Sequence, residues 1–335
     1  MTSILVEKLE HVADVAIRTP GKGNALGPDF WRELPETFGA LDRDDEVRAI
    51  VLRADGDHFT YGLDLIAMMG ELGPIVSGGL ADARTRLYDM ILRLQDAVSS
   101  IARCRKPVVA AVHGACIGGG VDVISACDVR LAAKDARFSV REVRVAMVAD
   151  LGSLQRLPRI VGEGNARELA LTGKDIDAER ALRIGLVSDV LESREAVWDA
   201  ARATARAIAE NPPRVVQGVK RVMNERVARE DATGLRHVAA WNSAFLPSED
   251  LGEALTFNPV TEESPQLDDP DDLTRVAFDR ELLDPLEPSD ADIARMLERS
   301  DQWDHFLTNG DRCLQINDLT ALYYEGAFDG SWAQA

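Results

Sequence analysis

Three acidic residues in the middle of the chain stand near a glycine-rich segment and carry side chains that can transfer protons. Asp122 directly follows the segment from Gly114 to Val121, and Glu142 and Asp150 come next, eight residues apart. The stretch around Asp150 is largely apolar, and burial there would raise the pKa of a carboxyl group. A carboxyl group whose pKa approaches neutrality is a suitable general acid or base.

Each of these carboxylates also has a simpler interpretation. Asp150 could cap the turn at Leu151-Gly152, and Glu142 could pair with Arg141 or Arg144 on the surface. For either residue taken alone the simpler interpretation is favoured. A carboxylate is costly to bury unless it is paired or used, however, so the combination with the neighbouring glycines favours a site.

Two glycine-bearing segments could supply backbone N–H groups to a ligand. One runs from Gly56 to Leu65 and the other from Gly114 to Gly120, and each follows an apolar strand and leads into a predicted helix. The first N–H groups of a helix lack partners within it, and two such amides can hold a developing oxyanion. The alternatives are tight strand–helix packing and phosphate binding, although the G-x-G-x-x-G spacing and the Lys-Ser/Thr of a P-loop are missing.

Two histidines lie within or next to these segments, His58 in the first and His113 just before the second. We expect His113, at a strand end, to be structural, and His58 to lie on a loop surface. No histidine accompanies the three carboxylates at the spacing of metal ligands, so no metal site is predicted.

Alternating strands and helices must position these residues. Strands are predicted at 12–17, 49–52, 108–112, 129–132 and 136–140, and helices at about 28–41, 80–101 and 195–258. The runs at 49–52 and 108–112 are short, apolar and rich in β-branched residues, which is typical of buried strands. Such alternation indicates an α/β core with parallel crossovers.

The acidic charge gathers at the C-terminal end. The chain has 335 residues and a net charge of -19, of which residues 251–335 contribute -15 (20 acidic, 5 basic) and residues 1–250 contribute -4. This balance argues against nucleic acid or an anionic membrane as a partner. Residues 261–272 resemble a linker, and 289–309 could form an amphipathic helix. Eight of the chain's 18 aromatic residues lie in 251–335, so we expect part of it to dock on something.

The remaining global features predict a cytoplasmic protein. The four cysteines are scattered without a C-x-x-C pair, which argues against a disulfide framework and against a zinc site. No apolar run reaches the roughly 20 residues that a membrane span needs. Neither end of the sequence shows a signal peptide, a retention signal or a peroxisomal address.

The body resembles the crotonase (enoyl-CoA hydratase/isomerase) superfamily from about residue 5 to about residue 255. Its most similar part, residues 114–164, reads GACIGGGVDVISACDVRLAAKDARFSVREVRVAMVADLGSLQRLPRIVGEG, and the spacing of Asp122, Glu142 and Asp150 singles out the Δ3,5-Δ2,4-dienoyl-CoA isomerase branch. The resemblance implies an α/β crotonase-like spiral of β-β-α units with a C-terminal helical region. We accordingly divide the chain into a catalytic core at 1–195 and a helical region with oligomer contacts at 196–260, followed by an acidic extension at 261–335 for which the resemblance offers no account.

The resemblance also assigns roles to individual residues. The backbone amides of Leu63 and Gly119 fall on the oxyanion hole. Glu142 falls on a glutamate shared with hydratases, Asp122 replaces the second hydratase glutamate, and Asp150 falls on the extra aspartate of dienoyl-CoA isomerases. The residues matched to substrate and CoA binding are Asn24, Ala25, Leu26, Tyr61, Gly62, Asp64 and Leu65.

The implied reaction moves the double bonds of a 3,5-dienoyl-CoA to positions 2 and 4. A proton leaves C2 and another arrives at C6, so two separated carboxylates serve better than one. We assign Asp150 as the base at C2, Glu142 as the acid at C6 and Asp122 as a tuning group, with the order of the first two left open. The alternatives are an enoyl-CoA hydratase and a non-catalytic binding protein. The resemblance further implies an acyl-CoA substrate, no metal or other cofactor, and a homotrimer or homohexamer.

Overall fold

The computed structural model describes residues 2–68, 80–246, 248, 250 and 251. The chain divides into two units, Met1–Pro247 and Ser248–Ala335, and the description below concerns the first. The predicted linker at 261–272, the predicted helix at 289–309 and the acidic extension lie outside the described residues. Within the described part, no helix is both long and apolar enough to cross a membrane.

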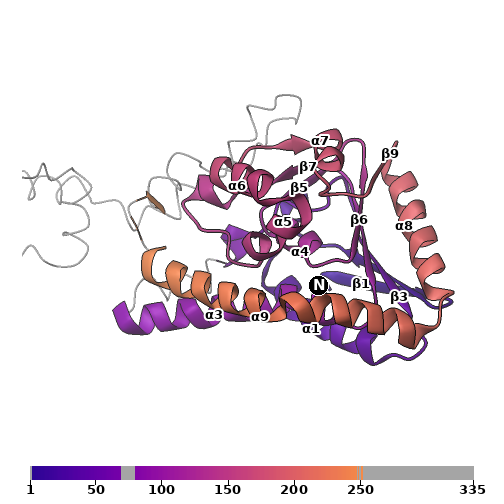
Figure 1. Ribbon diagram of the computed structural model, residues 1–335. Helices are drawn as coiled ribbons and strands as arrows, with labels where there is room; N and C mark the ends of the chain where they lie inside the picture. The colour runs from indigo at the N-terminus through magenta and orange to yellow at the C-terminus, as the bar shows by residue number, and fades with distance from the viewer. Residues whose placement is uncertain (1, 69–79, 247, 249, 252–335) are drawn as a thin grey trace, which may run out of the picture. The chain divides into compact units, whose positions relative to one another are not determined.

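A six-stranded sheet runs through the unit (Figure 1). In spatial order its strands are β1 (Ile4–Leu9), β2 (Val12–Ile17), β3 (Ala49–Ala54), β4 (Val108–Val112), β6 (Val129–Ala133) and β9 (Asp189–Leu191). All neighbouring strands are parallel except β1 and β2. The predicted parallel α/β core is therefore confirmed, with β1 and β9 added as edge strands that the sequence pattern did not predict.

A second, smaller sheet passes through the glycine-rich segment. It consists of β5 (Ala115–Ile117), β7 (Arg137–Ser139) and β8 (Ile176–Asp177). β5 lies inside a segment whose glycines predict only a turn and a helix start. Three residues are too few to show a strand periodicity, and β5 exists because it pairs in parallel with β7.

Helices cover both faces of the large sheet. The described helices of the unit are α1 (Pro28–Arg43), α3 (Leu80–Arg103), α4 (Gly119–Ser125), α5 (Ser153–Val161), α6 (Glu163–Thr172), α7 (Ala178–Arg183), α8 (Arg194–Ala209) and α9 (Pro213–Phe245), with 3₁₀ turns η1 (Lys22–Asn24) and η2 (Glu142–Val145). Figure 1 shows α8 alone along one side of the sheet, and α3 beside α9 on the other side. The predicted helical region at 195–258 is two helices, and residues 252–258 lie outside the described part.

Alternate residues of β4 serve two separate cores. Val109 and Ala111 pack in the cluster that contains Val197 and Ala201 of α8. The other β4 residues, at 108, 110 and 112, pack in the main core with α1, α3 and α4. Because successive side chains of a strand point to opposite faces, a strand covered on both sides is apolar throughout, as this one is.

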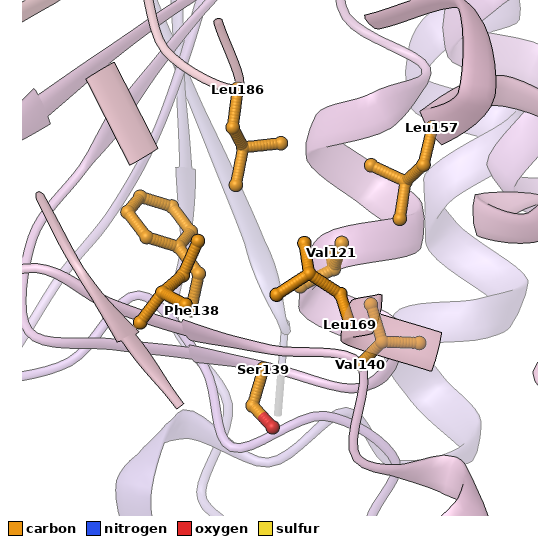
Figure 2. A pocket seen from close by; sticks show the side chains of 8 residues that line it. Val121, Phe138, Ser139, Val140, Leu157, Leu169 and Leu186 are labelled. Atoms are coloured by element: carbon orange, nitrogen blue, oxygen red, sulfur yellow. The ribbon is translucent and has the colours of Figure 1, made fainter. Parts of the chain in front are cut away.

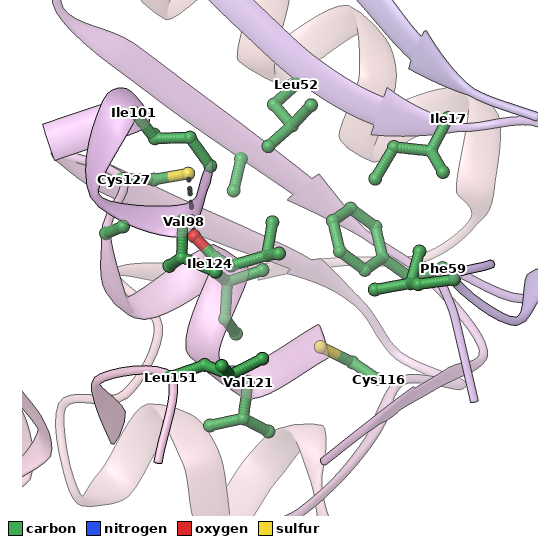
Figure 3. Close-up of a cluster of buried hydrophobic side chains, with 14 of the residues drawn as sticks. Ile17, Leu52, Phe59, Val98, Ile101, Cys116, Val121, Ile124, Cys127 and Leu151 are labelled. Atoms are coloured by element: carbon green, nitrogen blue, oxygen red, sulfur yellow. Dashed lines mark hydrogen bonds between the residues drawn. The ribbon is translucent and has the colours of Figure 1, made fainter. Parts of the chain in front are cut away.

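The main core continues underneath the segments that carry the chemistry. Figure 3 shows Phe59, Cys116, Val121 and Leu151 in one buried cluster. These four residues belong to the loop after β3, to β5, to α4 and to the turn before α5. The segments around Leu63, Gly119 and Asp150 are therefore anchored in close-packed protein, which fixes backbone positions well.

Candidate active site

Two backbone N–H groups, those of Leu63 and Gly119, lie next to each other. A Cβ atom placed on Gly119 would be 3.7 Å from Leu63 N, and one placed on Gly62 would be 3.2 Å from Gly119 N. Neither N–H group donates a hydrogen bond to an acceptor within the described part of the chain. Two neighbouring donors without partners are suited to an incoming oxyanion.

The loop before Leu63 depends on a glycine at position 62. Gly62 has a φ of 90°, and a Cβ atom there would lie 2.7 Å from Ile117 O of β5. The loop is fixed on its other side by Leu26, whose N–H donates to Gly62 O at 2.7 Å and whose carbonyl accepts from Asp64 N at 3.1 Å. The Leu63 amide is thus held between Leu26 and β5, and only glycine tolerates both the backbone angle and the close approach.

Asn24 directs its side chain into the protein rather than toward a ligand. Its Oδ1 accepts from Thr19 N at 2.8 Å, and its Nδ2 donates to Phe59 O at 3.0 Å. Its own carbonyl accepts from Thr60 Oγ1 at 2.7 Å. Asn24 therefore ties the early loop to the loop that carries Leu63, and the CoA contacts predicted for Asn24, Ala25 and Leu26 stay a prediction.

The other residues predicted to bind substrate line the same loop. The Tyr61 ring lies against Gly23, where a Cβ atom would collide with it. Asp64 Oδ1 accepts from Ala67 N at 2.9 Å, which closes a turn. Leu65 is half-buried. These positions surround Leu63, and their contact with a substrate stays a prediction.

The two histidines support the loops. His58 is half-buried: its Nδ1 accepts from Ala115 N at 3.2 Å, and its Nε2 lies 3.2 Å from Tyr61 Oη. The prediction that it lies on a loop surface is wrong, because the loop folds back on β5. His113 is buried, and its Nε2 lies 2.9 Å from Gly56 O, which agrees with its structural interpretation. Burial lowers the pKa of both rings.

Asp122 is buried in the first turn of α4, with 1% of its surface exposed. Its Oδ1 accepts a hydrogen bond of 2.6 Å from Ser153 N of α5. Burial raises the pKa of Asp122 to about 6, against the opposing effects of the Ser153 hydrogen bonds and the Arg156 charge. Asp122 is therefore a largely ionised group at neutral pH, close to the other two carboxyl groups.

Glu142 lies at the start of η2, beside the glycines that precede α4. A Cβ atom on Gly118 would be 3.3 Å from its Oε1. Its Oε2 is shielded from solvent and has no hydrogen-bond partner among the described residues. Burial first, then the charges of Asp122 and Asp150, raise the pKa of Glu142 well above its usual value. The interpretation as a surface ion pair is wrong for Arg141, which pairs with Asp175 instead.

Asp150 follows η2 and precedes α5. Its side chain bonds to α9 rather than to the turn at Leu151-Gly152 that it could have capped. Its Oδ2 accepts a hydrogen bond of 2.7 Å from Asn242 Nδ2 of α9. Burial raises the pKa of Asp150 to about 7, with a further contribution from the Asp122 charge and opposition from the Asn242 hydrogen bond. Sequence reasoning missed Asn242, since no local pattern marks a residue that lies 92 positions away.

The three carboxyl groups form one electrostatic cluster with unequal proton affinities. Glu142 has the strongly raised pKa, while Asp150 has a value of about 7 and Asp122 of about 6. At neutral pH one group therefore holds a proton while another is ready to accept one, which is what paired acid and base catalysis requires. Among the described residues, no group of three or more His, Cys, Asp and Glu side chains is arranged to hold a metal ion.

The space behind α4 is filled by apolar side chains (Figure 2). The residues around it are Val121, Phe138, Ser139, Val140, Leu157, Leu169, Ile176 and Leu186. They leave no room for a water molecule, so this space is close-packed protein behind α4. The rigid backing fixes the helix that carries Asp122 and the Gly119 amide.

Comparison with known proteins identifies the body of the chain. The family model for enoyl-CoA hydratase/isomerase matches residues 7–257. The mitochondrial Delta(3,5)-Delta(2,4)-dienoyl-CoA isomerase of Dictyostelium discoideum is 42% identical over 249 residues, covering 73% of this chain and 84% of that protein. The peroxisomal Delta(3,5)-Delta(2,4)-dienoyl-CoA isomerase of Arabidopsis thaliana is 43% identical over 247 residues, covering 73% and 88%. The acidic extension at 261–335 lies outside all residues matched by the family model.

Solved structures confirm the predicted crotonase-like fold. The crystal structure of an enoyl-CoA hydratase/isomerase from Mycobacterium paratuberculosis superposes with a TM-score of 0.68 at 29% identity, covering 77% of this chain and 98% of that one. The prediction of a cytoplasmic location is wrong by these comparisons, since the relatives above are named mitochondrial and peroxisomal. That prediction relied on the lack of a recognisable address, and addresses are short segments that the catalytic fold does not require.

Proposed function

The chain belongs to the enoyl-CoA hydratase/isomerase family, and on that premise we propose that it converts 3,5-dienoyl-CoA to 2,4-dienoyl-CoA. The observation that carries the proposal is Asp150, a half-buried carboxyl group with a raised pKa that interacts electrostatically with Asp122 and Glu142. A hydratase needs groups that activate water. The isomerisation instead removes a proton at C2 and adds one at C6, which needs a base and an acid at separate ends of the diene.

The reaction begins at the thioester. Its carbonyl oxygen accepts hydrogen bonds from the N–H groups of Leu63 and Gly119, which makes the C2 proton more acidic. Asp150 removes that proton, and the electron pair of the C–H bond spreads over a dienolate that extends from the thioester oxygen to C6. The two amides stabilise the negative charge on the oxygen. They are already in position before the reaction, so no rearrangement is needed.

The second proton transfer completes the shift. Glu142 donates its proton to C6, the carbonyl re-forms, and the double bonds now join C2 to C3 and C4 to C5. The pKa values support this direction, because Glu142 retains its proton at a pH where Asp150 begins to lose its own. Asp150 ends protonated and Glu142 ionised, so a proton returns from one to the other before the next turnover. Asp122 tunes both groups through its charge.

The same groups supply all that the reaction needs. Both proton transfers and the stabilisation of the oxyanion come from protein atoms, so we propose that no metal or other cofactor takes part. CoA enters only as part of the substrate. Activity that is unchanged after dialysis against a chelator is the expected result, and recovery only on adding a divalent metal would contradict this part of the proposal.

The experiment that tests the function uses purified full-length protein and a 3,5-dienoyl-CoA. The conjugated 2,4-dienoyl thioester has its own ultraviolet absorbance. We expect this absorbance to increase at a rate proportional to the enzyme concentration. In parallel the protein receives a 2-enoyl-CoA, and the loss of its double bond reports hydration. Rapid hydration without any dienoyl product would overturn the isomerase and establish the hydratase that the sequence left as an alternative.

We further propose that the protein assembles as a homotrimer or homohexamer through α9. Four apolar side chains of this helix, each more than half exposed, follow the spacing i, i+4, i+7 and i+8: Val215, Val219, Val222 and Met223. This spacing places them on one side of the helix, and such a stripe is typical of a surface that another helix or subunit covers.

A charge in this stripe tests the assembly. We expect Val222→Glu to reduce the mass measured by light scattering from a multimer to a monomer. Leu171→Glu, on the exposed side of α6, is the control and should leave the mass unchanged, because Leu171 is equally exposed and lies on another helix. A Val222→Glu protein that keeps the mass of the wild type would show that α9 is not the interface.

A further inference from the structure

Asp150 is held by two helices that are distant from it in the sequence. The amide of Asn242, on α9, donates both of its hydrogens to the Asp150 segment: Nδ2 lies 2.7 Å from Asp150 Oδ2 and 2.8 Å from Val148 O. Gln95, on α3, donates from Nε2 to Asp150 O at 2.7 Å and to Leu235 O at 2.9 Å. Asn242 and Gln95 are 2% and 4% exposed, so these contacts are made away from bulk water.

The side-chain amides of Gln95 and Asn242 have different roles, as their hydrogen-bond acceptors show. Gln95 binds only backbone carbonyls and joins the Asp150 segment to α9, so it fixes the main chain. Asn242 binds the carboxylate itself, and its second hydrogen holds the backbone two residues earlier. Because both hydrogens of the Asn242 amide are used, the amide plane and the carboxylate oxygen that it meets are both fixed.

The charged groups around Asp150 come from other elements. Asp122 of α4 and Glu142 of η2 are acidic neighbours that disfavour an additional negative charge. Arg156 of α5 is the nearby cation, and its charge acts on Asp122. On α9, Asp231 is paired with Arg159 of α5. The elements α3 and α9 therefore meet Asp150 with neutral amides, and Asn242 is the neighbour that favours the ionised carboxylate.

We propose that Asn242 is a positioning residue for the isomerisation, which orients the Asp150 carboxylate toward C2 and keeps it available as a base. The inference rests on the proposed function, in which Asp150 removes the C2 proton. It adds that α9, far along the chain from the segment with the glycines and the three carboxylates, supplies a residue that positions the base. A hydrogen bond donated to an ionised group stabilises that form more than the neutral form, so the donor sets the pH at which the base works.

The test compares two asparagines on the same helix. Asn242→Leu keeps the approximate shape of the side chain and removes the donor. Asn224→Leu is the matched control, because Asn224 also lies on α9 and donates to a carbonyl of α3, Ala102 O, at 2.9 Å, without touching a carboxylate. Asn224→Leu removes one hydrogen bond of α9 and Asn242→Leu removes two, so the control reports how a weakened α9 affects activity without any change at Asp150.

The pH dependence of kcat separates positioning from stability. We expect the acidic limb of the Asn242→Leu profile to move upward by roughly one pH unit or more, because a hydrogen bond to a charged group is lost. At pH 7 kcat should fall about 5-fold or more and recover partly at higher pH, while KM changes little. The control should keep the acidic limb of the wild type. An unmoved limb in Asn242→Leu would overturn the proposal.

A second variant and a second readout keep the test decisive. Asn242→Asp has the size of the original side chain and places another carboxyl group beside Asp150, so the limb should move upward further. Carbon NMR of the Asp150 carboxyl, assigned by its absence in Asp150→Asn, follows the same titration without any substrate. If wild-type protein lacks isomerase activity, the proposed function fails, and the NMR titration still decides the role of Asn242. An Asp150 titration that is equal in wild type and both variants refutes that role.

Discussion

Replacing Asp150 by asparagine should abolish activity and at the same time stabilise the fold. The amide has nearly the shape of the carboxyl group and keeps an oxygen that can accept the 2.7 Å hydrogen bond from Asn242. It cannot take a proton from C2. We expect kcat to fall by about 10²–10⁴-fold, the usual contribution of a general base, with a smaller effect on the binding of the CoA thioester.

The gain in stability follows from the raised pKa. Burial moves the pKa of Asp150 from 3.8 to about 7 in the folded protein. Between these values the unfolded chain has lost the proton while the folded one retains it, so ionisation favours unfolding. The penalty is absent below pH 4, grows up to pH 7 and stays constant above. About three pH units at roughly 1.4 kcal/mol each give up to about 4 kcal/mol, an upper value because Asp150 is not completely shielded from solvent.

Urea unfolding at pH 5 and pH 8 measures this effect. Asp150→Asn should be more stable than the wild type, and its advantage should be larger at pH 8 than at pH 5. The control is Asp199→Asn on α8, whose side chain is 78% exposed and which should change the free energy of unfolding little at either pH. A variant that is no more stable than the wild type at pH 8 would refute the argument for a buried, destabilising base. Full isomerase activity in Asp150→Asn would refute its catalytic role.

Further predictions concern the acid, the pH profile and the oxyanion loop. Glu142→Gln should lose isomerisation by about 10²–10⁴-fold while calorimetry still detects CoA-thioester binding; near-wild-type kcat would contradict its role as the acid. In the wild type, kcat should rise through about pH 7 as Asp150 loses its proton and fall at higher pH as Glu142 loses the proton it donates; a flat profile would contradict both assignments. Gly62→Ala should shift the Leu63 amide, because Gly62 has a φ of 90° and a Cβ atom there would lie 2.7 Å from Ile117 O. We expect the free energy of unfolding to fall by about 1–3 kcal/mol and kcat to be reduced.

The four inner strands of the large sheet were predictable because their signals are local. The residues of β4 and the first four of β3 are apolar on both faces, and the structure shows why: α8 covers one face and the main core the other. The short strands were not predictable in the same way. β5 and β8 have three and two residues, and each forms because a partner strand is close in space.

The candidate site also has features that the local sequence predicts and features that depend on contacts between distant segments. The glycines predicted free amides at two strand-to-helix connections, and the structure places Leu63 N and Gly119 N side by side. The apolar surroundings of Asp150 predicted a raised pKa, in agreement with the value of about 7. The surface location expected for His58 was wrong, because its neighbours come from β5, 57 residues later in the chain.

The sequence by itself determined which groups can react and which family the chain resembles, because residue types and their spacing along the chain are enough for both. Only the tertiary structure decided how those groups differ in proton affinity. That order depends on burial and on contacts between segments far apart in sequence, such as Asn242 with Asp150 and Ser153 with Asp122. Electrostatic interactions act through distance in space, and the sequence records only distance along the chain.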